Sequence, residues 1–430
     1  MILIVLVLLT VSSLTFGNRH NRDKAVQVRV QSADEWLRVE NVLEKYLKKQ
    51  DIDIWAYPNH NGKANLLIPG DLFNVIANQF DLIGLSYDVT VDDVSRLLDD
   101  IDVQLQEWNK EHKGIVGKYP TYDEILAWFD ELKTNYSGWI DTLDIGNTYD
   151  GRIHRSLKIS TGGTGKWKVY IEGAMHAREW ISPATVIYIT DQLIQGYANG
   201  DPEIVEWMEM LDWYILPVAN PDGYDYCFTD DRLWRKNRRP NNGTNCVGTD
   251  LNRNWSYQWG GVGADPDPCS NTYRGEHAES EVEVQNIVNL IMPEAEQFIY
   301  YMAYHSWGQQ FFTRWDYTAD EVPSDHEQLL DLAHRAVNAI VAVHDMYYEA
   351  GTAPELMYAF SGSSADWARG VAGIKYPYLE ELRDNGTYSF ILPPEQIVPT
   401  GEESWAGFQV VVREIVSKCS GISPPGPCLP

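Results

Sequence analysis

Apolar runs of strand length alternate with helical segments from residue 118 to the end of this chain, and no other feature restricts the fold as strongly. Continuous apolar runs are typical of strands buried on both faces, and helices between strands favour parallel pairing. The pattern predicts one large α/β domain with a mixed, mostly parallel sheet flanked by helices. The expected strands lie at 167–171, 212–220, 296–304 and 376–382, and helices are expected at 118–133 and 402–419.

A smaller unit precedes this domain. Strand-like runs at 25–30, 64–69 and 85–91 alternate with helical runs at 33–49 and 70–80, which indicates a small α+β domain. A polar amphipathic helix over 92–114 connects the two units. It carries Lys110 and Lys113 and no other lysine or arginine after Arg96, so it offers a discrete site to a trypsin-like protease. The predicted domains are residues 18–113 and 114–430.

The chain begins with the apolar run MILIVLVLLTVSSLTFG, followed by the basic stretch NRHNRDK. This pattern predicts a secretory signal peptide over residues 1–17, whereas the alternative, a membrane anchor, needs a longer run. A secreted, extracellular protein with no membrane partner is expected. The formal charge of −28 over 430 residues also argues against nucleic acid and anionic membranes as partners.

The five cysteines are too few for a disulfide scaffold but suffice for local disulfides. Cys246 and Cys269 bracket a loop rich in Gly, Asn, Pro and Asp, and Cys419 and Cys428 bracket a tail rich in Gly and Pro. We predict one disulfide in each place. Cys227 is then left as a buried free thiol.

Three residues that follow strand-like runs are candidate metal ligands. His176 and Glu179, in GAMHAREW, follow the run at 167–171, and His305 follows the run at 296–304. A surface ion pair is the alternative for His176 and Glu179. Because ligand sites in open α/β sheets form at the carboxyl ends of strands, the three side chains can converge at one edge.

Two imidazoles and one carboxylate would leave Zn²⁺ a fourth position for water, whose pKa the ion lowers. A general base is then required nearby. YPYLEELRD supplies Glu380 and Glu381 at the end of a strand-like run. Adjacent strand residues point to opposite faces, so only one of them can face the metal.

Five motifs in order, GAMHAREW, DRLWRKNR, TDLNRNW, AYHSWGQ and ELRDNGTYSF, resemble those of the secreted metallocarboxypeptidases of the carboxypeptidase A/B type. The resemblance covers the chain after the signal peptide, and residues 18–113 match the family's pro-segment in size. It implies a zymogen that an activating trypsin-like protease cleaves. It also implies one Zn²⁺ on His176, Glu179 and His305, with Glu381 as the base.

The resemblance implies further roles, each of which suits its residue type. Arg235 would stabilise the oxyanion, since it places fixed positive charge where negative charge develops. Asn252 and Arg253 would hold the substrate's terminal carboxylate, which suits the two-pronged guanidinium. Asp250 would accept the second N–H of His176. The other implied substrate-binding residues are Tyr358, which would close over the substrate, and Arg178, Trp307 and Phe390.

Simpler interpretations of these residues remain open. Arg235 lies among basic residues that could form a solvated patch, and Tyr358 could be a core aromatic residue. Arg178 could merely pair with a carboxylate. Trp307 stands where the family often has tyrosine, so the subsite before the cleaved bond can differ in shape here.

Specificity within the family depends on the charge in the pocket for the terminal side chain. The vertebrate B-type branch has an acidic residue just before the pair DW, where this chain has Ala365. The resemblance, however, implies that Asp316 lies at a pocket-lining position, where some branches of the wider family have their acidic residue, among the apolar residues Phe312, Ala353, Phe360 and Leu379. An unpaired buried carboxylate is costly, and a cationic substrate side chain would pair with it.

We therefore expect release of C-terminal Lys or Arg from peptides and proteins by a monomeric enzyme. The first alternative is A-type specificity for apolar and aromatic C-termini, with Asp316 pointing to water. The second is a catalytically inactive peptide-binding protein on the same fold, which would lack one of the zinc ligands, Glu381 or Arg235. All of these residues are present.

Overall fold

The computed structural model describes residue 20 and residues 22–47 and 52–426. The predicted signal peptide and Cys428 therefore lie outside the described residues. No helix in the described ranges is long and apolar enough to cross a membrane.

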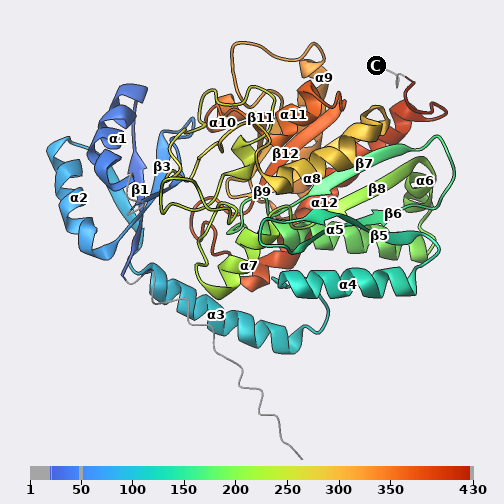
Figure 1. The fold of residues 1–430 in the computed structure, drawn as a ribbon, viewed down its shortest axis with the longest axis horizontal. Coiled ribbons are helices and arrows are strands. Elements are labelled where there is room, and N and C mark those ends of the chain that lie inside the picture. Colours follow the sequence, from blue (N-terminus) through green and yellow to red (C-terminus); the bar gives the residue numbers. More distant parts are fainter. Residues whose placement is uncertain (1–19, 21, 48–51, 427–430) are drawn as a thin grey trace, which may run out of the picture.

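An eight-stranded mixed sheet runs through the large domain, in the order β11-β10-β12-β9-β7-β8-β6-β5 (Figure 1). The four central strands are parallel to one another, whereas β10 and β6 run antiparallel to their neighbours β12 and β8. The predicted α/β fold with a mixed, mostly parallel sheet is confirmed. The strands are β5 (Ile140–Asn147), β6 (Ile153–Ile159), β7 (Trp167–Glu172), β8 (Leu211–Leu216), β9 (Phe298–Ser306), β10 (Gln310–Thr313), β11 (Glu349–Thr352) and β12 (Tyr376–Leu382).

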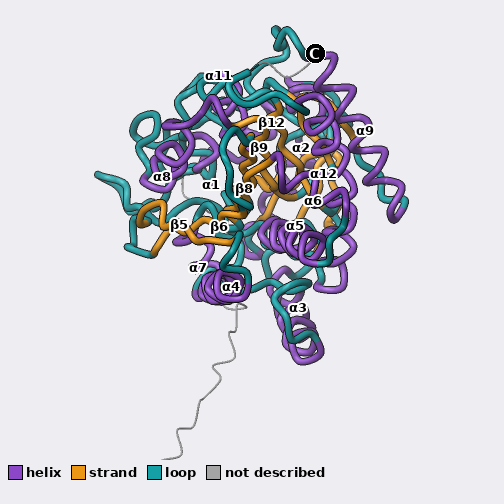
Figure 2. Tube along the Cα trace, turned by 90° about the vertical axis from the view of Figure 1, so that its right-hand side faces the viewer, coloured by secondary structure: helices purple, strands orange, loops and turns teal. Residues whose placement is uncertain are grey.

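Both faces of this sheet are buried, which explains the unbroken apolar runs. In β9, Tyr300 and Met302 pack into one core cluster, while Tyr301 and Ala303 pack into a second cluster on the other face. Helices α4 (Tyr122–Asn135), α5 (Ile181–Ala198), α9 (His326–His344) and α12 (Ile397–Cys419) contribute to the first cluster. Helices α8 (Val282–Ile291) and α11 (Ser364–Gly370) contribute to the second. Figure 2 shows the strands enclosed between helices.

Shorter helices complete the large domain. They are α6 (Pro202–Met210), α7 (Pro221–Thr229), α10 (Ala353–Leu356) and the 3₁₀ turns Leu251–Arg253, Met292–Gln297 and Pro394–Gln396. The predicted disulfide between Cys246 and Cys269 is present and closes a loop of this domain. Cys227 is a buried free thiol, as predicted. Cys419 is disulfide-bonded, but its expected partner lies outside the described residues.

The small N-terminal domain is a four-stranded antiparallel sheet in the order β2-β3-β1-β4 with two helices. Its elements are β1 (Lys24–Arg29), α1 (Ala33–Leu47), β2 (Asp53–Ala56), β3 (Lys63–Ile68), α2 (Gly70–Leu82) and β4 (Ser86–Val91). The sequence pattern did not predict β2. The connector is helix α3 (Val94–Glu111), with Lys110 in its last turn and Lys113 just beyond it.

Candidate metal centre and active site

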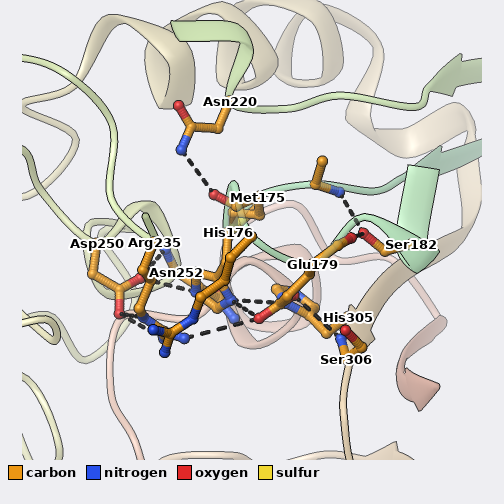
Figure 3. Close-up of polar contacts among 12 residues, drawn as sticks. Met175, His176, Glu179, Ser182, Asn220, Arg235, Asp250, Asn252, His305 and Ser306 are labelled. Carbon is orange, nitrogen blue, oxygen red and sulfur yellow. Dashed lines mark hydrogen bonds and ion pairs between the residues drawn. The ribbon is translucent and has the colours of Figure 1, made fainter. Parts of the chain in front are cut away.

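His176 and Glu179 lie in the turn that links β7 to α5. The Ser182 hydroxyl bonds both ends of this turn, because it accepts a hydrogen bond from the N–H of Ala174 and donates one to the carbonyl of Glu179, each at 2.8 Å (Figure 3). His305 is the next-to-last residue of β9, which pairs with β7 in parallel. The carboxyl ends of two neighbouring strands therefore bring the three side chains together.

Ligand atoms of the three residues lie within 4.8 Å of one another, and all three side chains are buried. Nδ1 of His176 lies 2.7 Å from one carboxylate oxygen of Glu179, and Nδ1 of His305 lies 3.0 Å from the other. The two Nδ1 atoms are 3.1 Å apart. Nitrogen and oxygen donors bind zinc at about 2.0–2.2 Å, which puts the donor atoms of a tetrahedral site about 3.3 Å apart.

The residues therefore fit a zinc ion. Nε2 of His176 lies 3.1 Å from Oδ1 of Asp250, so the proton of this imidazole belongs on Nε2 and Nδ1 keeps a lone pair for the metal. The site has three protein ligands, His176, Glu179 and His305. This is the ligand number of catalytic zinc sites, which keep one position open.

Glu381 and Glu380 occupy opposite faces of β12. Glu381 stands beside His305 in the strand register and lines the same cavity as His176 and Glu179. Burial and the charge of Glu179 raise the pKa of Glu381 to about 8, and a bound divalent cation would lower it again. Glu380 instead accepts a hydrogen bond from Ser404 on α12 at 2.7 Å, away from the candidate metal site.

Asp250 links Arg235 to the metal ligands. Its Oδ2 accepts hydrogen bonds from Nε and Nη2 of Arg235 at 3.2 and 2.8 Å, while its Oδ1 faces His176. Burial raises the pKa of Asp250, but Arg235 and His176 outweigh this effect and hold the pKa well below its usual value. Arg235, whose side chain is 12% exposed, is thus a fixed guanidinium 3.9 Å from the Glu179 carboxylate. It is not part of a solvated patch.

Asn252, Arg253 and Tyr358 line the same cavity. Nη2 of Arg253 donates to the Tyr358 hydroxyl at 3.2 Å, and its guanidinium stacks 4.4 Å from the Phe360 ring. The Asn252 side chain accepts the N–H of Ser364 at 2.9 Å. Arg253 is 1% exposed and has no carboxylate within hydrogen-bonding distance among the described residues, which suits a receptor for an incoming carboxylate.

The cavity at this centre measures about 50 Å³. Its lining includes both Trp307 and Phe390, whose rings are 6.4 Å apart. The Arg178 guanidinium lies 4.1 Å from the Phe390 ring and is ion-paired with Asp53 of the small domain. Sequence reasoning allowed a carboxylate partner for Arg178 but could not locate it 125 residues away.

Strand β2 of the small domain enters the site, a feature that the sequence did not reveal. Trp55 and Ala56 line the cavity, and the Trp55 ring lies edge-on to Phe390 at 5.7 Å. Tyr57, directly after β2, packs its ring 5.0 Å from Tyr358. The only signal in the sequence is the short run DIWAY, whose four-residue strand is too brief for a period-2 pattern to stand out.

Asp316 is fully buried and does not point to water. The expectation that it is an unpaired carboxylate among apolar residues was wrong, because Arg314, two residues earlier, forms an ion pair with its Oδ2. A buried carboxylate of this kind needs a counter-charge, and the chain supplies one locally. The four apolar residues named with it are buried together in one core cluster, namely Phe312, Ala353, Phe360 and Leu379.

Comparison with known proteins agrees with this geometry. The model of the zinc carboxypeptidase family matches residues 125–407, which include every ligand and the Glu381 position. The chain belongs to the zinc carboxypeptidase family. It is a metallocarboxypeptidase with a zinc site of His176, Glu179 and His305, and it carries an N-terminal propeptide domain.

Both A-named and B-named relatives are similar to this chain. Carboxypeptidase B of Astacus astacus is 44% identical over 69% of this chain and 96% of its own length. Carboxypeptidase A4 of Mus musculus is 35% identical over 91% of this chain and 93% of its own. The structure of carboxypeptidase A from Helicoverpa armigera matches with a TM-score of 0.84 at 27% identity, covering 93% of this chain and 98% of that one.

Proposed function

We propose that this carboxypeptidase is secreted as a zymogen and, once activated, releases C-terminal Lys or Arg from peptides and proteins. The proposed specificity rests on the surroundings of one atom, Oδ1 of Asp316. This oxygen is buried and has no hydrogen-bond partner among the described residues, whereas Oδ2 is bound by Arg314 and Ser363. A cationic side chain would give the orphaned oxygen its partner.

The residues around the metal suit hydrolysis of the last peptide bond. Zn²⁺ on His176, Glu179 and His305 would lower the pKa of a water molecule and polarise a carbonyl group. Glu381 takes the proton from the attacking water and passes it to the leaving amine. Arg235, held by Asp250, faces the oxygen that becomes negative in the transition state.

Other residues that line the cavity position the terminal residue of the substrate. Arg253 and Asn252 bind the substrate's carboxylate, and Tyr358, already hydrogen-bonded to Arg253, covers it. Arg178, Trp307 and Phe390 contact the part of the substrate before the cleaved bond. Because only a free carboxylate pairs with Arg253, the enzyme acts at chain ends.

Residues 18–113 act as the inhibitory pro-segment in this proposal. Asp53 pairs with Arg178, Trp55 covers Phe390, and Tyr57 covers Tyr358, so a substrate cannot reach these side chains. A trypsin-like protease cutting after Lys110 or Lys113 would release the segment. Secretion rests on the predicted signal peptide and agrees with the disulfide between Cys246 and Cys269.

Rates on peptides that differ only in the last residue test the specificity. After trypsin treatment and removal of trypsin, kcat/KM should be higher for C-terminal Arg and Lys than for Leu and Phe. Replacing one partner of a desolvated charge pair costs roughly 2–5 kcal/mol, so Asp316→Ala should lower kcat/KM for Arg by at least about thirtyfold. A wild-type preference for Leu or Phe would favour the A-type alternative.

A further inference from the structure

Three charged side chains form a fully buried cluster beside the substrate pocket. Arg314 follows β10, Asp316 is two residues further on, and Asp366 lies on α11; each is 0% exposed. Nη1 of Arg314 pairs with Oδ2 of Asp316 and lies 3.5 Å from Oδ1 of Asp366. The catalytic roles proposed above use neither Arg314 nor Asp366.

The remaining polar atoms of the carboxylates are nearly all engaged. The Asp366 carboxylate accepts hydrogen bonds from the backbone N–H of Asp316 at 3.0 Å and from that of Tyr317 at 3.2 Å. Ser363 donates to Oδ2 of Asp316 at 2.8 Å. The exception is Oδ1 of Asp316, which is buried and has no partner among the described residues. In this cluster, one acceptor, Oδ1 of Asp316, and one donor, Nε of Arg314, are thus left without a hydrogen-bond partner among the described residues.

The charges of the cluster do not balance. Two carboxylates share one guanidinium, and an excess negative charge in a buried place is costly. Of the other groups nearby, the charge of Arg253 also acts on Asp316, but Arg253 is proposed to bind the substrate's terminal carboxylate. The charge of Arg314 also acts on Tyr301, whose hydroxyl donates a hydrogen bond to Glu172. Burial raises the pKa of both carboxyl groups, and Asp316 raises that of Asp366 further.

Resting on the proposed Lys/Arg specificity, we propose that Asp316 and Asp366 hold one proton between them in the empty pocket, and that a cationic C-terminal side chain displaces it. The O–H bond of the shared carboxylic acid breaks, and the proton leaves to the solvent. The ammonium or guanidinium group of the substrate takes its place as the counter-charge at Oδ1 of Asp316. Arg314 is a positioning residue that holds Oδ2 and leaves Oδ1 for the substrate.

Proton displacement makes the specificity depend on pH. Below the raised pKa of the pair, a cationic substrate competes with the proton, so its kcat/KM rises with pH by about tenfold per pH unit. Above that pKa, the effect levels off. A neutral side chain does not compete with the proton. The preference for a cation therefore increases with pH, while every titration common to both substrates cancels in the ratio.

Two peptides that end in arginine or in its uncharged isostere citrulline provide the test. The trypsin-activated enzyme is assayed on both from acid to neutral pH, and the ratio of the two kcat/KM values is followed. We expect a ratio above one that rises with pH. In Asp366→Asn the excess charge is gone, so the ratio should no longer depend on pH.

The outcomes separate this proposal from the one on which it rests. A ratio above one that does not change with pH would keep the Lys/Arg specificity and refute proton displacement. A ratio of one or less at every pH would refute both. Because the wild-type profile alone decides between these results, the test stands even if Asp366→Asn does not fold.

Discussion

Glu380 and Glu381 are neighbours in the chain, but they meet different surroundings. Glu381 faces the metal ligands, and Glu380 faces helix α12. Both carboxyl groups have pKa values raised to about 8, mainly by burial, so a shifted pKa alone does not identify the catalytic residue. We infer the base from the direction in which the strand points each side chain.

The two neighbours form a matched pair for mutagenesis. Glu381→Gln should retain zinc but lower kcat by roughly 10²–10⁴-fold, because the amide cannot accept the proton of the attacking water. Glu380→Gln should leave kcat nearly unchanged. Steady-state kinetics and metal analysis of both variants check this. Equal losses in the two variants would show that the base has been assigned to the wrong residue.

The burial of Asp316 could be predicted from the sequence, but its ion pair could not. The resemblance to the family placed it at a pocket-lining position, and it is buried. The ion pair with Arg314 was not predicted, although Arg314 lies only two residues away. Loop residues have no periodic pattern that indicates where their side chains point. A buried ion pair depends on the folded loop, which the sequence pattern does not specify.

At the level of elements, the central strands were predictable and the edge strands were not. Strands β7, β8, β9 and β12 are buried on both faces and read as apolar runs. The four-residue strands β10 and β11, and the more exposed β5, escaped detection because short or half-exposed segments resemble loops. The metal ligands were found because they follow predictable strands.

Strand β2 was missed for a related reason, and it carries the contacts that we propose to be inhibitory. Asp53→Asn and Trp55→Ala should each raise the activity of the uncut protein, because they remove the ion pair to Arg178 and the ring on Phe390. After trypsin treatment, all forms should have the same activity. The control is Asp88→Asn, which removes only an exposed ion pair with Arg29. It should change neither the activity of the uncut protein nor the activity after trypsin treatment.

The uncut and cut proteins are compared on one peptide substrate. If uncut wild type already hydrolyses the peptide as fast as the cut enzyme, then residues 18–113 are not inhibitory. If only the double variant of Asp53 and Trp55 gains activity, the two contacts are redundant and the inhibitory role stands.

For the whole molecule, buried carboxyl groups make stability depend on pH. Burial, opposed by the hydrogen bond from Ser404, raises the pKa of Glu380 from 4.5 to about 8. The native state therefore binds this proton more tightly than the unfolded chain. The resulting stability is complete below pH 4.5 and is lost as the pH rises through about 8.

Glu380→Gln removes this titration and keeps the shape of the side chain. Between about pH 5 and pH 8, the free energy of unfolding of the wild type should fall relative to the variant by up to about 1.4 kcal/mol per pH unit. Denaturant unfolding of both proteins at several pH values measures the difference. A constant difference would mean that Glu380 is ionised in the native state throughout.

The central claim is that Arg253 and the zinc site together restrict hydrolysis to the end of a chain. The most direct measurement is mass spectrometry of two peptides of identical sequence ending in Arg, one with a free C-terminal carboxylate and one with a C-terminal amide, after incubation with the activated enzyme. The free acid should lose its terminal arginine, and the amide should react at least roughly tenfold more slowly because the charged contact to Arg253 is lost. Cleavage of the amide at the same rate, or cleavage at internal bonds, would contradict the account.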